Sequence, residues 1–371
     1  MENHIKVLIS GGGTGGHIFP AISIANAIKA KIPDADILFV GAENRMEMEK
    51  VPAAGYNIIG LPVCGFDRKN VLKNCKVVVK LLQSINKARK TVKRFQPDIA
   101  VGVGGYASGP TLWAAAHMEI PTVIQEQNSY AGVTNKLLAS KAKKICVAYD
   151  NMEKFFPKEK IVITGNPVRQ ELLNKTISQE EAVRFFNLDP EKKTILVIGG
   201  SLGARTINES ILDWITRSES DEVQIIWQTG KNFDAKAQKA LSQKISHHIK
   251  QMPFISHMDM AYKAADLVIS RAGASSISEL CLLEKPVILV PSPNVAEDHQ
   301  TKNAQALEYK GAAILIRDNE ARDKLMQTAL AVIRDNDKLK NMQDNIKTLA
   351  QENSAARIAD IIIQIVNERK K

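Results

Sequence analysis

The chain opens with a short apolar strand that runs directly into a glycine-rich turn, and this pairing restricts the fold more than any other feature. The run from Ile5 to Ile9 is mostly apolar, as expected of a strand buried on both faces of a parallel sheet. The turn that follows, Gly11 to His17, reads GGGTGGH. Its glycines lack β-carbons, so backbone N–H groups can approach a ligand closely. We expect a helix after it, with Pro20 in its first turn and its positive dipole end toward an anionic or sugar-like ligand.

The turn by itself admits other interpretations. Gly11, Gly13 and Gly16 have the G-x-G-x-x-G spacing of a dinucleotide-binding fingerprint, which requires an acidic residue at the end of the second strand. Glu43 is the one candidate there, so binding of a nicotinamide or flavin cofactor is a weak alternative. A packing turn that holds no ligand is a further alternative. The rest of the chain has to decide between them.

The same unit recurs in the second half of the chain. An apolar strand from Thr194 to Ile198 enters a second glycine turn, and a helix is expected to begin near Ala204. Strands and helices alternate in both halves, which predicts an α/β fold of parallel sheets covered by helices on both faces. The stretch from Gly165 to Arg169 interrupts this alternation and is the predicted linker. We therefore expect two Rossmann-like domains that face each other across a cleft, the first covering residues 1–166.

Composition narrows the class of protein. The chain has 371 residues, 44% of them hydrophobic and 24% charged, which suits a globular protein of two domains. There is no apolar run of about 18 residues and no room for a signal peptide before the first strand, so we expect a cytoplasmic protein without membrane spans. The four cysteines are scattered and are expected to be reduced thiols. Metal-ligand spacings and a G-x-S-x-G nucleophile motif are absent, which argues against a metal site and against serine acyl transfer.

The net charge of +10 is concentrated in one predicted amphipathic helix. This basic helix, Lys69 to Arg94, is interpreted either as a solvated surface or as a surface that docks on anionic lipid headgroups. Nucleic acid is a poorer partner, because aromatic residues make up 5% of the chain and none alternate with the cations as stacking platforms would. The helix has a charged stripe of Lys76, Lys80, Lys87, Lys90 and Arg94 and an apolar stripe of Val78, Leu81, Leu82, Ile85, Val92 and Phe95.

Polar residues and glycines cluster where the predicted strands end. A second glycine loop runs from Gly102 to Gly109, and a serine-rich helix start from Ala274 to Glu279 would suit a diphosphate. Beside a phosphate, Glu279 would serve best by accepting hydrogen bonds from ribose hydroxyls; the alternative is a simple partner of the helix dipole. His17 and Glu126 are two more polar residues at predicted strand ends. Together with the glycine loops and the serine-rich helix start, they predict a cleft that binds a nucleotide-linked substrate and a second, phosphate-bearing substrate.

Motifs in the same order along nearly the whole chain resemble those of the MurG family of bacterial glycosyltransferases. They are GGGTGGHIFPA at the start, GVGGYASGP from Gly102, EQN from Glu126, GNPVR ending at Arg169, GGSLGAR from Gly199, SRAGASSISE ending at Glu279 and DHQTKNA from Asp298. Members of this family transfer N-acetylglucosamine from UDP-N-acetylglucosamine (UDP-GlcNAc) to lipid I, forming lipid II in peptidoglycan synthesis. The resemblance implies a peripheral enzyme at the cytoplasmic face of the cell membrane.

The resemblance further implies a GT-B fold and an inverting transfer to the C4 hydroxyl of the lipid-linked N-acetylmuramyl sugar, without metal or cofactor. It implies that a C-terminal helix of about residues 353–371 crosses back to complete the N-terminal domain, which would bind acceptor and membrane. Residues 167–352 would then form the UDP-sugar domain. The basic helix would serve to reach an acceptor that lives in an anionic membrane.

The resemblance also assigns roles to individual residues. Ile255 would offer its backbone to the uracil and Glu279 its carboxylate to the ribose, while Gln300 or its neighbour His299 would meet the sugar hydroxyls. Residues matched to the donor are Thr14, Gly15, Gly16, Asn128, Arg169, Ser201, Ile255, Ala274, Ser275, Ser276, Ile277, Ser278, Glu279 and Gln300. Residues matched to the acceptor diphosphate are Gly12, Gly13, Gly104, Gly105, Tyr106 and Ser108.

An inverting displacement needs a base for the incoming hydroxyl and stabilisation of the departing diphosphate. His17 is the predicted base, because an unperturbed imidazole titrates near operating pH. Glu126 is the competing base, or the group that orients it. Ser201, Arg169 and the helix start at Ala274 could stabilise the departing UDP. Three alternatives use parts of the same set: a glycosyltransferase acting on a membrane diacylglycerol, a UDP-sugar epimerase, and a membrane scaffold without activity.

Overall fold

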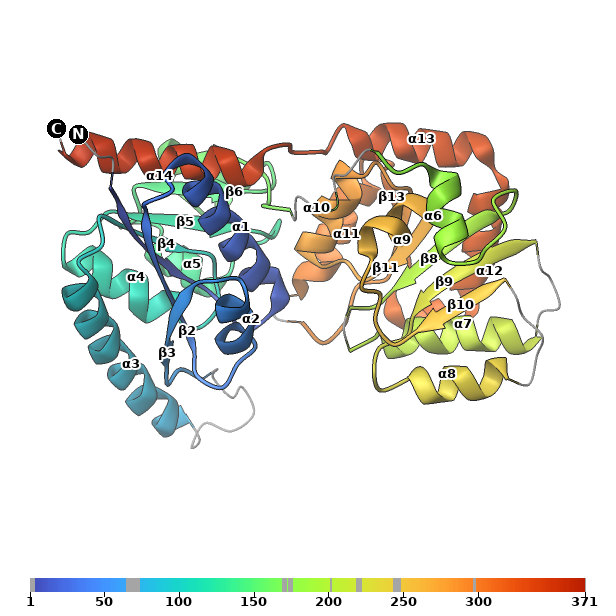
Figure 1. Cartoon of the computed structure of the whole chain (residues 1–371), viewed down its shortest axis with the longest axis horizontal. Coiled ribbons are helices and arrows are strands. Elements are labelled where there is room, and N and C mark those ends of the chain that lie inside the picture. The colour runs from blue at the N-terminus through green and yellow to red at the C-terminus, as the bar shows by residue number, and fades with distance from the viewer. Residues whose placement is uncertain are drawn as a thin grey trace. The chain divides into compact units, whose positions relative to one another are not determined.

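A computed structural model gives the chain as two compact units, Met1–Val168 with Gln351–Lys371, and Arg169–Ala350. We call them unit 1 and unit 2 (Figure 1). The structure describes residues 4–64, 74–168, 172, 176–200, 202–217, 222–242, 248–295 and 298–370, and it leaves the side chains of residues 74–76 undescribed. Within that description each unit is an α/β layer structure, as the alternating sequence pattern predicts.

Unit 1 contains a parallel sheet of seven of the described strands, in the order β3-β2-β1-β4-β5-β6-β7. The strands are β1 (Lys6–Ser10), β2 (Asp36–Ala42), β3 (Asn57–Leu61), β4 (Ile99–Gly102), β5 (Thr122–Glu126), β6 (Lys144–Val147) and β7 (Ile161–Ile163). The helices are α1 (Gly15–Lys31), α2 (Glu47–Ala53), α3 (Asn74–Phe95), α4 (Ser108–His117), α5 (Val133–Leu138) and α14 (Ser354–Lys370), with short 3-10 turns η2 (Met152–Lys154) and η3 (Lys158–Lys160).

Unit 2 repeats this plan with six of the described strands, in the order β10-β9-β8-β11-β12-β13. The strands are β8 (Lys193–Ile198), β9 (Val223–Gln228), β10 (Ile249–Met252), β11 (Leu267–Ser270), β12 (Val287–Leu289) and β13 (Ala313–Leu315). The helices are α6 (Gln179–Phe185), α7 (Arg205–Arg217), α8 (Asp234–Leu241), α9 (Met258–Ala264), α10 (Ala274–Leu282), α11 (His299–Glu308), α12 (Ala321–Arg334) and α13 (Asn336–Lys347), with the 3-10 turn η6 (Asp318–Glu320).

The strand order places the glycine turns at the ligand-binding edge of each sheet. In unit 1 the strands β2 and β4 lie on opposite sides of β1. Ser10 at the end of β1 is paired with Gly102 at the end of β4. The corresponding pair in unit 2 is Ile198 of β8 and Ser270 of β11. Open parallel sheets bind ligands at such a switch point, beyond the carboxyl ends of the strands. Both sequence-predicted glycine loops of unit 1 therefore begin side by side.

The last helix, α14, belongs to the core of unit 1. Ile358, Ile362 and Val366 are buried in one cluster with Ile24 and Ile28 of α1, and α14 lies next to α1 in Figure 1. Burial of an aliphatic side chain contributes about 1.5–3 kcal/mol relative to exposure, so this face is a substantial part of the stability of unit 1. Residues 300 or more positions apart in the sequence thus complete one core.

Two local features differ from the sequence expectation or refine it. The helix α1 begins at Gly15, so Pro20 lies in its second turn rather than in its first. At that position proline has no N–H to donate to the carbonyl oxygen four residues earlier.

The buried cysteines Cys146 and Cys281 are free thiols. Burial raises the pKa of both thiols to about 12, which keeps them protonated and unreactive at neutral pH.

Candidate active site

The two glycine loops of unit 1 pack against each other through their backbones. A β-carbon added to Gly105 would lie 2.4 Å from the Gly12 carbonyl oxygen, so no larger residue fits between the loops in this arrangement. Gly105 also has a φ of +85°, which L-residues rarely adopt. The Ser108 hydroxyl, fully buried, lies 2.8 Å from the Ser10 carbonyl oxygen and 2.9 Å from that of Gly104. Ser108 therefore joins the loops from within, while Tyr106 is 59% exposed.

The imidazole of His17 lies over this junction, in the first turn of α1. Its Nδ1 is 3.1 Å from the Gly12 carbonyl oxygen and 3.3 Å from the Thr14 hydroxyl. A carbonyl oxygen only accepts hydrogen bonds, so Nδ1 carries the proton in the neutral imidazole and the lone pair is on Nε2. A β-carbon on Gly104 would lie 2.9 Å from Nε2. The second glycine loop thus passes directly beside the nitrogen that could take a proton.

Glu126, the competing base, is enclosed by hydrogen-bond donors. Oε1 accepts from the backbone N–H of Asn128 at 3.1 Å and from its Nδ2 at 3.2 Å. Oε2 accepts from the Gly132 N–H at 3.0 Å and from Asn135 Nδ2 at 2.8 Å. The side chain is 2% exposed. Four donors on one carboxylate suit a group that holds the loop after β5 in shape.

The neighbouring polar residues of the EQN and GNP motifs form a buried network. Gln127 Nε2 donates to the Val103 carbonyl oxygen at 2.6 Å. Asn166 Nδ2 donates to the Gln127 carbonyl oxygen at 3.0 Å, and Gln125 Nε2 donates to Asn166 Oδ1 at 2.8 Å. Buried polar networks of this kind fix loop conformation because each broken bond leaves an unsatisfied group. The network therefore ties the loops after β4, β5 and β7 to one another.

In unit 2 the serine-rich segment forms the first turns of α10, as the sequence predicts. Gly273 is its N-cap residue, with extended backbone angles, and the N–H groups of the first turn point out of the helix at its positive dipole end. The buried Ser275 hydroxyl has no hydrogen-bond partner among the described residues. A buried hydroxyl without a partner costs stability unless a ligand satisfies it. The Glu279 carboxylate is held at 3.1 Å by the buried hydroxyl of Tyr262.

The other predicted donor residues of unit 2 lie around the same sheet edge, whereas Thr14, Gly15, Gly16 and Asn128 belong to unit 1. The N–H of Ile255 donates to Gln228 Oε1 at 3.0 Å, and Gln228 Nε2 donates to the Gly200 carbonyl oxygen at 2.9 Å. Gln228 thereby connects the predicted uracil contact to the glycine turn. Gln300, the second residue of α11, accepts the Ser292 N–H at 2.8 Å. Arg169 and Ser201 lie outside the described residues.

Three residues that sequence reasoning did not select hold this candidate site in place. Glu47 of α2 accepts the Gly13 N–H at 2.9 Å, Gln228 bridges Gly200 and Ile255, and Tyr262 holds Glu279. Each acts on a residue 17 to 34 positions away. No sequence motif contains both residues of any of these pairs. The one signal in the sequence for such a supporting residue is an acid, amide or hydroxyl side chain at a position that the fold is expected to bury.

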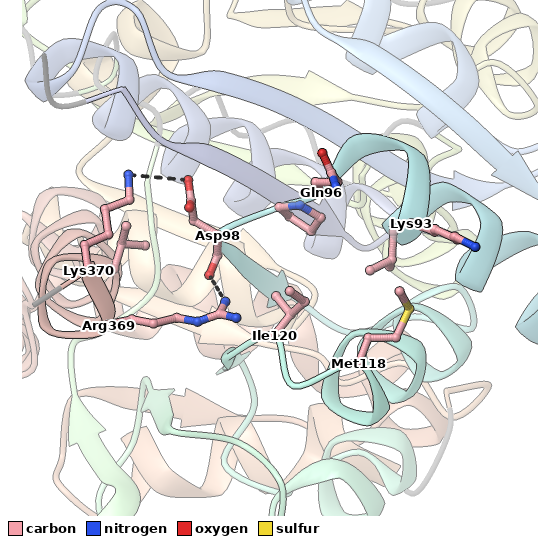
Figure 2. Close-up of a pocket in the computed structure, with 10 residues that line it drawn as sticks. Lys93, Gln96, Asp98, Met118, Ile120, Arg369 and Lys370 are labelled. Atoms are coloured by element: carbon pink, nitrogen blue, oxygen red, sulfur yellow. Dashed lines mark hydrogen bonds and ion pairs between the residues drawn. The ribbon is translucent and has the colours of Figure 1, made fainter.

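A cavity of unit 1 lies away from the glycine loops. It has a volume of about 440 Å³ and is lined by Lys93, Asp98, Met118 and Arg369 among others (Figure 2). Arg369 donates to the Asp98 carbonyl oxygen at 3.3 Å, and Lys370 lies 3.8 Å from the Asp98 carboxylate. The cavity opens where β4 begins, whereas the glycine loops follow the strand ends. It is therefore not part of the candidate active site.

Among the described residues, no three His, Cys, Asp or Glu side chains lie close enough together to hold a metal ion. In that part of the chain, no helix combines the length and apolar character that crossing a bilayer requires.

Comparisons with known proteins agree with this geometry. Residues 7–147 match the N-terminal domain of glycosyltransferase family 28, and residues 194–361 match its C-terminal domain. The crystal structure of MurG from Acinetobacter baumannii superposes with a TM-score of 0.78 at 27% identity, over 97% of this chain and 99% of that one. A UDP-N-acetylglucosamine 2-epimerase superposes at 15% identity with a TM-score of 0.66, which shows a common fold. The two units therefore have the fold of GT-B glycosyltransferases.

Curated relatives extend the match over the full chain. A protein of Parabacteroides distasonis is 63% identical over 98% of this chain and 99% of its own length, and a protein of Flavobacterium psychrophilum is 51% identical over the whole of both chains. Both are named UDP-N-acetylglucosamine–N-acetylmuramyl-(pentapeptide) pyrophosphoryl-undecaprenol N-acetylglucosamine transferase. The chain belongs to glycosyltransferase family 28 and, within it, to the MurG family.

Proposed function

We propose that this enzyme transfers N-acetylglucosamine from UDP-GlcNAc to the C4 hydroxyl of the N-acetylmuramyl sugar of lipid I, with inversion and without a metal ion. The observation that carries the proposal is the 63% identity, end to end, with a relative named for transfer to that lipid-linked acceptor. The geometry of unit 1 supports it, because an imidazole with its lone pair on Nε2 lies beside two glycine loops that could hold a diphosphate.

In the proposed step, Nε2 of His17 takes the proton of the C4 hydroxyl as the C4 oxygen attacks the anomeric carbon of N-acetylglucosamine. The bond from that carbon to the UDP oxygen breaks, and the electron pair leaves with UDP. The first turn of α10 and the unsatisfied Ser275 hydroxyl would stabilise the charge on the leaving diphosphate. Glu279, oriented by Tyr262, would accept hydrogen bonds from the ribose hydroxyls. Arg169 and Ser201 keep the donor roles that the family resemblance implies.

Within unit 1, the glycine loops would bind the acceptor diphosphate through part of their backbone. The Gly13 N–H is already donated to Glu47, and the Gly11 N–H is donated to the Val40 carbonyl oxygen at 3.3 Å. The first-turn amides of α1, which begins at Gly15, lie at the positive end of the helix dipole and would supply further contacts. The four hydrogen bonds that the Glu126 carboxylate accepts support a positioning role for this residue.

We expect acceptor-dependent release of UDP when purified protein is incubated with UDP-GlcNAc and a short-chain lipid I analogue. Release should continue in EDTA, and NMR of the product should show a β-linked N-acetylglucosamine at C4. Omitting the acceptor is the control and should leave only slow hydrolysis. Formation of UDP-N-acetylmannosamine without acceptor would instead identify an epimerase, and loss of release in EDTA would contradict the metal-independent mechanism.

We further propose that α3 docks unit 1 on the anionic, cytoplasmic surface of the cell membrane. Its apolar residues Val79 and Leu82 are 54% and 62% exposed, and they share the helix with Lys80, Lys87 and Arg89. The other side of the helix packs into unit 1 through Ala88 and Val92. Exposed apolar side chains among cations are what an interfacial helix presents to anionic lipid. The helix α3 begins at Asn74, and the start of the predicted basic helix, from Lys69 to Lys73, lies outside the described residues.

Leu82→Glu should weaken sedimentation with phosphatidylglycerol-containing vesicles at least tenfold, because it removes an apolar contact of about 1.5–3 kcal/mol and adds a repelled charge. Tyr309→Glu is the matched control, since Tyr309 is an exposed apolar residue of unit 2. Vesicles of phosphatidylcholine alone should bind the unchanged protein more weakly. If the unchanged protein, Leu82→Glu and Tyr309→Glu all bound equally to phosphatidylglycerol-containing and to phosphatidylcholine vesicles, this role of α3 would be ruled out.

A further inference from the structure

The buried carboxylate of Glu47 is the strongest feature that the proposed mechanism leaves unused. Glu47 is the first residue of α2 and is fully buried. Its Oε2 accepts the Gly13 N–H at 2.9 Å, and its Oε1 accepts the Ala42 N–H at 2.9 Å. The carboxylate thus joins the loop after β1 to the end of β2. Hydrogen bonds between an ionised carboxylate and backbone N–H groups are among the stronger ones in proteins.

The space around Glu47 is shaped to admit this side chain. A β-carbon on Gly12 would lie 2.1 Å from Glu47 Oε1, and one on Gly41 would lie 2.6 Å from its Cγ. Gly12 has a φ of +157° and Gly13 a φ of +87°. The glutamate therefore passes between two glycines, and the loop takes a conformation that other residues rarely adopt. A residue that only capped a helix would not require glycines on both sides.

The hydrogen bond to Gly13 has a direct consequence for His17. The Gly13 N–H and the Gly12 carbonyl belong to the same planar peptide group. Glu47 holds the N–H end, and the carbonyl end accepts the proton on Nδ1 of His17 at 3.1 Å. Hydrogen bonds at the two ends of a peptide group polarise it and strengthen each other. The carboxylate and the imidazole are therefore linked through a single peptide.

We propose that Glu47 is a positioning residue for His17, acting through the Gly12–Gly13 peptide. It fixes the direction of the Gly12 carbonyl, and so keeps the proton on Nδ1 and the lone pair on Nε2. It also raises the basicity of the imidazole, because its negative charge stabilises the imidazolium through the polarised peptide. The Gly12 carbonyl, the Thr14 hydroxyl and the Gly104 backbone, which lie against the imidazole, are uncharged. The catalytic part of this inference rests on the proposed role of His17.

The test is Glu47→Gln, which keeps the shape, removes the charge and leaves one of the two backbone N–H groups without its acceptor. We expect kcat to fall about 10- to 100-fold, the range seen when partners that orient metal-ligating histidines are removed, with KM for UDP-GlcNAc unchanged within twofold. The acid limb of the kcat profile should move to lower pH, because the imidazolium loses its stabilising charge. Glu49→Gln is the matched control: Glu49 lies on the same helix, with its side chain 79% exposed, and this variant should behave as the unchanged protein.

A double-mutant cycle separates this role from a structural one. If Glu47 acts through His17, Glu47→Gln should cost little more in a His17→Ala background, whereas an equal further loss there would overturn the proposal. NMR of ¹⁵N-histidine-labelled protein gives a reading that needs no activity. His17 should be the Nδ1–H tautomer in the unchanged protein, and a mixture with a lowered pKa in Glu47→Gln. An unchanged tautomer and pKa would also overturn it. Absence of transfer by the unchanged protein would refute the proposed function and leave the NMR result standing.

Discussion

His17→Ala should lower kcat for transfer to the lipid I analogue about 10³-fold, within the range that general base catalysis contributes. The physical reason is the loss of Nε2, the nitrogen that carries the lone pair when Nδ1 donates to the Gly12 carbonyl oxygen. KM for UDP-GlcNAc should stay within about threefold, because binding of the uracil and ribose is proposed to depend on unit 2. Steady-state UDP release at saturating donor and acceptor is the measurement.

His17→Asn makes this experiment sharper. The Asn side-chain amide can occupy the place of Nδ1 and donate to the Gly12 carbonyl, but it has no counterpart of Nε2. It should therefore be as slow as His17→Ala while keeping the loop in shape. If His17→Asn retained more than about a fifth of the activity, His17 would be a positioning residue, and the base would have to be sought elsewhere, with Glu126 as the next candidate.

Gly105→Ala should disrupt both glycine loops of unit 1 together. The new β-carbon would lie 2.4 Å from the Gly12 carbonyl oxygen, and neither backbone can move without breaking contacts of the other. A left-handed residue costs about 1–2 kcal/mol and forced overpacking about 1–3 kcal/mol more. We expect a Tm lower by about 5–10 °C and transfer about 100-fold slower, because displacement of catalytic groups by about 1 Å has effects of that size.

Gly55→Ala is the control for backbone strain. Gly55 has a φ of +86°, almost that of Gly105, but a β-carbon there would meet nothing within 4 Å. It should show the strain cost of about 1–2 kcal/mol and keep full transfer activity. Thermal unfolding and UDP release of both variants can be compared directly. Equal effects of Gly105→Ala and Gly55→Ala on Tm and on transfer would show that the close approach of the two loops is unimportant.

Much of this architecture can be predicted from the sequence because its signals are local. The apolar run before Gly11 and the one before Gly199 both form strands of parallel sheets, β1 and β8. The serine-rich segment after Arg271 forms the start of α10. Buried strands and glycine turns need particular residue types at consecutive positions. The GT-B fold expected from the family resemblance is confirmed by the comparison with MurG of Acinetobacter baumannii.

What could not be predicted depends on contacts between distant residues. Glu47 reads in the sequence as an ordinary acid near a helix start, and only the tertiary structure places it against Gly13. Glu126 reads equally well as a base or as an orienting group, until its four hydrogen bonds are seen. Pro20 was expected in the first turn of α1, because the sequence does not show that the helix already begins at Gly15. The roles of individual site residues remain predictions.

The return of α14 to unit 1 has a consequence for synthesis of the protein on the ribosome. The apolar face of α1 is completed by Ile358, Ile362 and Val366, which are translated after the whole of unit 2. Lys370 also donates to the His4 carbonyl oxygen at 2.9 Å, which joins the end of α14 to the residues just before β1. Unit 1 therefore cannot close its core until the ribosome has translated all of unit 2 and then α14. A nascent chain stalled in the second domain would expose this apolar face to chaperones and proteases.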